Sequence, residues 1–186
     1  MKKYIKHFIT ITKHKFVVMK WCFRMGIPLR GILHDLSKYS IIEFFSSAKY
    51  FCGTSSPIDK EKKAKGYSLA WQNHQNKNKH HWEYWVDWNK GNIYGVKIPF
   101  KYIIEMFCDF VGAGKVYSKE KWTTKEPLDY FYKVKDNRVY NSETKELFED
   151  LLFQLSLFTK EKEFFNWFKR SKKYMKKEYK GEKEND

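Results

Sequence analysis

The residues with the clearest potential for chemistry are a histidine and an aspartate that stand side by side, His34 and Asp35. Imidazole nitrogen and carboxylate oxygen both bind divalent transition metals, and one turn of chain can point both into a cleft. Apolar neighbours such as Ile32 would hold that turn against a core. Lys38 follows closely enough to meet an anion that such a metal carries.

The other candidate ligands are spread along the chain, and all six histidines fall within the first 81 residues. In chain order the candidates are His14, His34 with Asp35, His74, His80 with His81, and Asp109. We expect at least one of the adjacent histidines to bind and leave open which. Because each group falls on a separate predicted helix or helix end, one cleft in a helical bundle would gather them. Such a set suits one or two ions of Mn, Fe, Ni or Zn.

Two of these ligands have rival interpretations. His7 lies one heptad before His14 on the same helical face, and we favour His14 because it lies nearer the His34 pair. His7 is then a surface or packing residue. Asp109 stands in an apolar segment, where a buried carboxylate needs a compensating charge, either a metal or a salt bridge to a lysine or to Arg30.

Three cationic side chains are candidates for substrate binding. Lys38 either contacts a phosphate or is an ordinary surface lysine. Arg30 either contacts substrate or pairs with Asp35 or Glu43. Lys77 lies in a polar break of the chain at residues 76–79. We take Asp35 and Lys38 as the candidate catalytic residues.

The hydrophobic pattern predicts an all-α fold. A helix over residues 3–25, ended by Gly26 and Pro28, is indicated by apolar residues at three- and four-residue spacing: Ile5, Phe8, Ile9, Thr12, Phe16, Met19 and Phe23. A short helix is expected to carry His34 and Asp35. Ser40 and Glu43 look like a capping box that opens the next helix, which gives Glu43 a structural role first.

The remaining chain predicts further helices and no strands. They run from Pro57 to His74 with Ser56 as cap, from Pro99 to the glycines at 112–114, over 127–134, over 141–158 and over 161–180. Gly91 to Gly95 is predicted to be a turn, and residues 181–186 a frayed end. We expect a helical domain at 1–158, with a basic C-terminal helix and tail at 159–186.

Composition limits the class of protein and partner. A chain of 186 residues with net charge +15 fits one folded domain with an anionic partner: nucleotide, nucleic acid or membrane surface. A lysine-rich composition also follows from genome base bias. Three distant cysteines favour a reducing cytoplasm over a disulfide scaffold or zinc ribbon. We expect no signal peptide, and no apolar run reaches the ~18 residues of a membrane span.

The ligand order H…HD…H…HH…D resembles that of the HD-domain superfamily of metal-dependent phosphohydrolases. The extra histidines resemble its binuclear branch, which includes cyclic-dinucleotide phosphodiesterases and mixed-valent di-iron oxygenases. Four phrases within residues 4–150 look like a family of uncharacterised HD-like proteins from bacteria and phages. They are Pro28-x-Arg30-Gly31, Ala70-Trp71-x-x-His74, Asn78-x-His80-His81-Trp82-x-Tyr84-Trp85 and Asp109-x-x-Gly112-Ala113-Gly114.

The resemblance implies a small phosphorylated substrate, such as a nucleotide, with Lys38 facing the phosphate. Asp35 has two oxygens to share and would bridge two metals. The GYP triplet of the cyclic-dinucleotide enzymes is absent, and no glutamate follows the HD pair where mononuclear nucleotidases keep one. His74 and His80 lie closer together than the matching ligands usually do. Either residues 76–79 fold back sharply, or one of these histidines binds substrate.

Two other functions share the sequence features. The ligand inventory also matches the HD-type di-iron oxygenases. A non-catalytic basic module would instead bind a nucleotide, or a nucleic acid through the C-terminal helix. The aromatic stripe at residues 82–88 is either core or a platform for a nucleobase.

Overall fold

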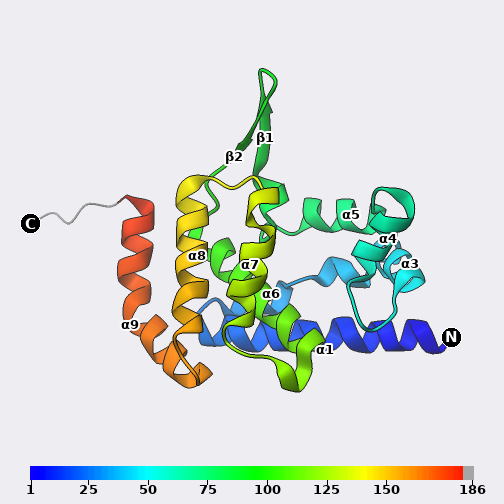
Figure 1. Ribbon diagram of the computed structural model, residues 1–186, viewed down its shortest axis with the longest axis horizontal. Coiled ribbons are helices and arrows are strands. Elements are labelled where there is room, and N and C mark those ends of the chain that lie inside the picture. The colour runs from blue at the N-terminus through cyan, green and yellow to red at the C-terminus, as the bar shows by residue number, and fades with distance from the viewer. Residues whose placement is uncertain (182–186) are drawn as a thin grey trace, which may run out of the picture.

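The computed structural model describes residues 1–181 and confirms the all-α prediction (Figure 1). The long helix α1 (Lys2–Arg24) lies along one side of the molecule and packs against α6 (Phe100–Ser118). Helices α3 (Ile41–Tyr50), α4 (Pro57–Lys65) and α5 (Leu69–Lys77) gather near the N-terminal end of α1. Helices α7 (Glu126–Val134), α8 (Ser142–Ser156) and α9 (Glu161–Lys180) gather near its C-terminal end.

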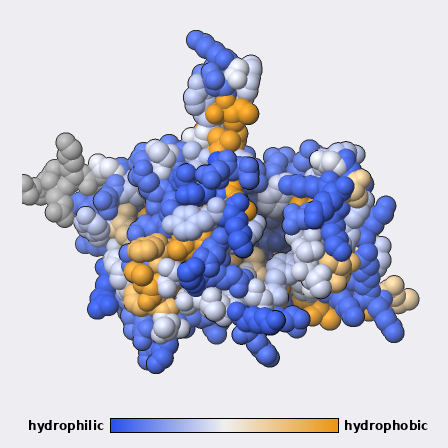
Figure 2. Space-filling view, in the orientation of Figure 1, coloured by the Kyte–Doolittle hydropathy of each residue, from blue (hydrophilic) through white to orange (hydrophobic). Residues whose placement is uncertain are grey.

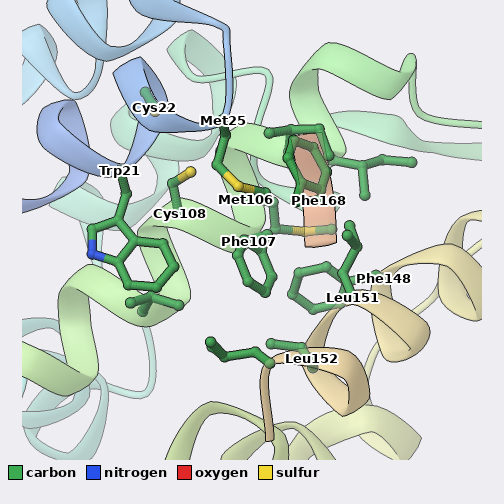
Figure 3. Packing of buried hydrophobic residues seen from close by; sticks show 14 of the residues in the cluster. Trp21, Cys22, Met25, Met106, Phe107, Cys108, Phe148, Leu151, Leu152 and Phe168 are labelled. Carbon is green, nitrogen blue, oxygen red and sulfur yellow. The ribbon is translucent and has the colours of Figure 1, made fainter. Parts of the chain in front are cut away.

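The hydrophobic core lies in the second of these regions, and aromatic rings dominate it (Figure 3). The ring centroid of Trp21 in α1 lies 4.6 Å from that of Phe165 in α9, and Phe107 in α6 stacks on Phe164 at 5.4 Å. Leu151 and other side chains of α8 complete the packing. The apolar face of α9 thus belongs to the same core as α1 and α6.

Helix α1 does not bury the apolar stripe from which the helix is predicted. Ile9 and Phe16 of that stripe are 45% and 59% exposed. The buried face of the helix consists of His7, Ile11, His14, Val18, Trp21 and Cys22. Periodicity predicts a helix correctly, but it does not say which face packs when a polar site lies inside.

The short helix expected around the His34-Asp35 pair is wrong in its bounds. Helix α2 (Pro28–Leu33) begins at a proline and ends before His34. The pair instead lies in the connection to a short 3-10 turn, η1 (Leu36–Tyr39).

Helix α6 passes through the glycines that were expected to end it. A Cβ built on Gly112 would lie 2.4 Å from Cγ2 of Val18 in α1, so the glycine permits close packing of two helices. The helix therefore continues for another turn, to Ser118.

The single helix predicted from Pro57 to His74 is two helices. Gly66 ends α4 with a left-handed φ of 83°, which glycine adopts without strain. Ser68 then caps α5 by accepting a hydrogen bond of 3.1 Å from the backbone N–H of Trp71.

The turn predicted at residues 91–95 is part of a β-hairpin, which corrects the expectation of no strands. Strands β1 (Val86–Asn89) and β2 (Asn92–Gly95) pair antiparallel after a second 3-10 turn, η2 (Trp82–Trp85). Lys90 and Gly91 both have positive φ, which suits a two-residue hairpin. The hairpin projects from the helical body and is largely exposed, so its strands show no buried alternation (Figures 1 and 2).

The other expected helices agree with the structure within a residue or two. Short 3-10 turns, η3 (Lys119–Lys121) and η4 (Lys135–Asn137), flank α7. The part of the expected frayed end from residue 182 onward lies outside the described residues. Within residues 1–181, no helix combines the length and hydropathy that crossing a bilayer requires.

Candidate metal centre

The His34-Asp35 pair sits at a sharp turn of the backbone. Asp35 has φ 53° and ψ 27°, a left-handed conformation that costs free energy for a residue with a side chain. Both side chains are buried, with exposed fractions of 0% and 1%. A backbone outlier that holds two polar groups inside the protein is typical of a functional site.

One group of donors forms where α1, α6 and this turn meet. His14, His34, Asp35 and Asp109 each offer an atom within 4.8 Å of the others. Nε2 of His14 lies 2.9 Å from Oδ1 of Asp109, and Nε2 of His34 lies 3.2 Å from Oδ2 of Asp35.

A second group forms around the other oxygen of Asp35. His74, His80 and His81 join Asp35 within the same 4.8 Å limit. Nε2 of His74 lies 3.3 Å from Oδ1 of Asp35, and Nε2 of His80 lies 3.4 Å from it. The two oxygens of Asp35 therefore face different groups of donors, so this carboxylate could serve both groups.

The close sequence spacing of His74 and His80 is accommodated by a fold-back of the chain. Asn78 is buried, and its Nδ2 donates a 2.8 Å hydrogen bond to the carbonyl oxygen of His74. The backbone N–H of His81 donates to the carbonyl oxygen of Asn78 at 3.1 Å. Both adjacent histidines reach the cluster, with ring centroids 4.1 Å apart.

The inward-facing atoms of this cluster have no hydrogen-bond partners in the protein. A buried polar atom without a partner costs about 1–3 kcal/mol. Six such atoms converge here, beside Oδ2 of Asp35, which is ion-paired with Nζ of Lys38 at 2.5 Å. A cation is the partner that satisfies imidazole nitrogens and a carboxylate oxygen together. The six atoms are Nε2 of His14, His34, His74, His80 and His81, and Oδ1 of Asp35.

The electrostatics of the cluster divide its histidines. Burial opposes charge on His34, but Asp35 and Asp109 outweigh it and raise the pKa of His34 well above its usual value. Burial and then the neighbouring imidazoles of His80 and His74 hold the pKa of His81 well below the usual value. Burial raises the pKa values of Asp35 and Asp109, but His34 and Lys38 beside Asp35, and His14 and His34 beside Asp109, lower both well below the usual range. Ionised carboxylates at this centre favour a cation.

A buried glutamate behind the cluster is hydrogen-bonded to one of the histidines and lies close to a second. Oε1 of Glu105 lies 3.1 Å from Nδ1 of His34 and 3.3 Å from Nδ1 of His80. Its Oε2 accepts a 2.6 Å hydrogen bond from Nε of Arg30. A carboxylate at Nδ1 fixes the tautomer that leaves Nε2 free to bind a metal. Arg30 thus pairs with Glu105, which corrects the expectation of Asp35 or Glu43.

Glu43 has the same role toward His74. Its Oε2 lies 2.8 Å from Nδ1 of His74, and Nδ2 of Asn73 donates to its Oε1 at 2.6 Å. Only half of the expected capping box forms, because Ser40 accepts a hydrogen bond from the backbone N–H of Glu43 while the carboxylate turns inward.

Sequence reasoning missed Glu105 entirely, although a signal was present. The residue lies one turn before Asp109 in the same apolar helix. A buried carboxylate needs a compensating charge, and this reasoning applies to Glu105 as well as to Asp109.

A cleft of about 1020 Å³ opens onto the cluster and lies between the α3–α5 side and the α7 side of the molecule (Figure 2). Its wall includes Lys38, whose Nζ lies 2.5 Å from Oδ2 of Asp35. Trp82 also lines it, whereas Trp88 in the hairpin is 68% exposed. Lys77 is exposed at the end of α5 and, like Arg30, does not line this cleft.

His7 is a packing residue, and it is buried. Its ring lies 5.3 Å from that of Phe44 and 5.2 Å from that of Phe51. His14, one heptad later, reaches the donor cluster, as the sequence argument favoured.

Comparison of the sequence with known proteins assigns the chain to a protein family. Searches of curated proteins and of solved structures return no significant match. A model of a protein family of unknown function, DUF5662, matches residues 3–154, which are most of the chain. The residues of the buried His/Asp cluster and those that line the cleft all lie within the matched range, and the chain belongs to the DUF5662 family.

Proposed function

We propose that this protein is a metal-dependent phosphohydrolase of the HD-domain type, acting on a nucleotide or another small phosphate ester. The observation that carries the proposal is the pair of donor groups that share Asp35 and lie beside a cleft. The volume of the cleft is at the upper end of the range for small-molecule sites, roughly 300–1,000 Å³. His14, Lys38, His81 and Asp109 belong to both the cluster and the cleft wall.

The donors would suit two divalent transition-metal ions. His14, His34 and Asp109 would hold one, His74, His80 and His81 would hold the other, and Asp35 would serve both. When bound, such ions supply Lewis-acid charge to a phosphoryl group and acidify water at the site. The chain itself places Lys38 at the cleft wall. Asp35 raises the pKa of Lys38 above its usual value, so its ammonium stays charged and is positioned to stabilise negative charge on the phosphate.

The cleft has features that suit a nucleotide. Trp71, Trp82 and Tyr130 provide aromatic surface for a base. Lys133 and Arg138 provide positive charge away from the cluster.

The test is elemental analysis of the purified protein followed by a panel of nucleotides and phosphomonoesters. We expect one to two equivalents of Mn, Fe, Ni or Zn, and phosphate or nucleoside monophosphate release that His34→Ala abolishes. Lys38→Met should lower kcat with the metal content unchanged. A fully metal-loaded protein that turns over nothing in the panel would contradict the proposal.

The same experiment separates the alternatives, because each leaves a different signature. Iron with a mixed-valent spectroscopic signal would favour a di-iron oxygenase built on the same donors. Salt-sensitive nucleic-acid binding that survives His34→Ala would favour a binding module.

A further inference from the structure

The N-terminal part of the molecule exposes an unusual amount of apolar surface. Of the 27 large hydrophobic residues that are exposed among residues 1–181, 14 lie within the first 45 residues. Exposed apolar side chains that gather on one face of a protein mark an interaction site.

Helix α1 organises this surface in rows that repeat every seven residues. Seven residues make almost two full turns, so residues at this spacing lie nearly above one another. The buried row is His7, His14 and Trp21, the basic row is Lys6, Lys13 and Lys20, and the apolar row is Ile9, Phe16 and Phe23. The basic and apolar rows are both exposed.

The apolar row continues onto neighbouring elements. Tyr4 of α1 contacts Phe45 of α3 with ring centroids 6.0 Å apart, and Phe8 contacts Tyr39 of η1 at 5.9 Å. We define the docking patch as the apolar row together with eight further apolar side chains, all more than a third exposed. These are Ile5, Phe8, Leu29, Ile32, Leu36, Ile41, Ile42 and Phe45.

The charge around the docking patch identifies its partner. Residues 1–34 contain eight lysines and arginines and no aspartate or glutamate. A second copy of the chain would bring the same cations and no carboxylate from residues 1–34 to the interface, so self-association through this face is opposed by repulsion. An apolar helical face flanked by lysines is the pattern of a segment that lies in the surface of an anionic membrane.

We propose that the docking patch binds the surface of an anionic lipid bilayer, with the apolar row in the acyl boundary and the basic row against the headgroups. The inference is independent of the hydrolase proposal. Phe16 follows His14 by two residues, about 200° around the helix, so the patch and the cleft lie on opposite sides of α1. A membrane-bound molecule would keep its cleft open to the aqueous phase.

The experiment is co-sedimentation of the full chain with vesicles of phosphatidylcholine alone or mixed with phosphatidylglycerol. We expect binding to the mixed vesicles only, weakening as salt screens the basic row. Phe16→Glu should lower the partition coefficient by about tenfold or more, because it removes an apolar side chain and adds a repelled charge. Phe153→Glu on α8 is the matched control, since Phe153 is also exposed and lies outside the patch; it should bind like wild type.

Metal content and circular dichroism of both variants establish that the fold is retained. Equal binding to both vesicle types, no binding, or unchanged binding of Phe16→Glu would overturn the proposal. A dimer in light scattering that Phe16→Glu dissociates, with no vesicle binding, would assign the docking patch to a second copy instead.

Discussion

The two donor groups around Asp35 differ in composition and in how they are built. The group of His14, His34 and Asp109 takes its ligands from α1, α6 and the turn at Asp35, and two carboxylates serve it. The group that contains His74 takes its histidines from a short segment of 8 residues, from His74 to His81, and only the shared carboxylate serves it. The group of His14, His34 and Asp109 is therefore more anionic, and long helices position it. The group that contains His74 depends on a local fold-back of the chain. We infer that the first group binds its ion more tightly.

The largest effect is expected at the residue that the two groups share. Asp35→Asn should remove both ions and lower any metal-dependent turnover below detection, because it removes the charge that both groups use. Asparagine tolerates the left-handed backbone at this position, so the fold should remain. Metal analysis and circular dichroism check both points. A variant that keeps two equivalents of metal would show that Asp35 does not bridge.

Removing one histidine from either group tests whether the groups are separate. His14→Ala and His81→Ala should each lower the metal content by one equivalent, and His81→Ala should leave the tighter ion. Titration with a chelator distinguishes the ions by their rates of loss. If His14→Ala releases both ions together, the cluster acts as one site.

The glutamates behind the cluster should show a smaller, graded effect. Glu105 lies against histidines of both groups, whereas His74 is the one histidine of the cluster that Glu43 contacts among the described residues. Loss of such a carboxylate typically costs about 10–100-fold in metal affinity. Glu105→Gln should therefore weaken both ions and Glu43→Gln only one, as measured by competition with a chelator. If the two variants lower metal affinity equally, the two glutamates do not act on different parts of the cluster.

The smallest effect concerns His7, the packing counterpart of His14. Burial and then Lys38 lower the pKa of His7 to about 4 from its ordinary value of 6.5. At this residue the unfolded chain therefore binds more protons than the folded chain below pH 6.5, so the contribution of His7 to stability is lost as pH falls from 6.5 toward 4. His7→Leu should remove about 1–2 kcal/mol of this loss. Urea unfolding of the metal-free wild type and the metal-free variant at pH 7 and pH 5 measures this difference in stability. If the stability of the two proteins depends on pH in the same way, the pKa shift of His7 is contradicted.

Much of the helical order and the donor set follows from sequence, since both rest on local patterns. A run such as Ile103 to Val111 predicts a buried helix, and an isolated carboxylate at Asp109 stands out against it. The split at Gly66 and the passage of α6 through Gly112 could not be predicted in the same way. The same residue ends one helix and permits close packing in another, and only tertiary contacts decide between these roles.

The largest errors of sequence reasoning come from polar residues that are buried and apolar residues that are not. In α1 the histidines face inward because a polar cluster replaces part of the core, and Phe16 is left outside. Arg30 and Glu105 are 75 residues apart, so their pairing depends on the fold as a whole.

The glycine at position 112 sets the distance between two donors of the cluster. It lies one turn after Asp109, and a methyl group added there would meet Val18 and lie 3.5 Å from the ring of His14. The spacing between α1 and α6, and with it the gap between two donors on different helices, is thus set by a side chain reduced to hydrogen. Exchanging that hydrogen for a methyl would push α1 and α6 apart and widen the gap between His14 and Asp109, with every donor side chain left in place.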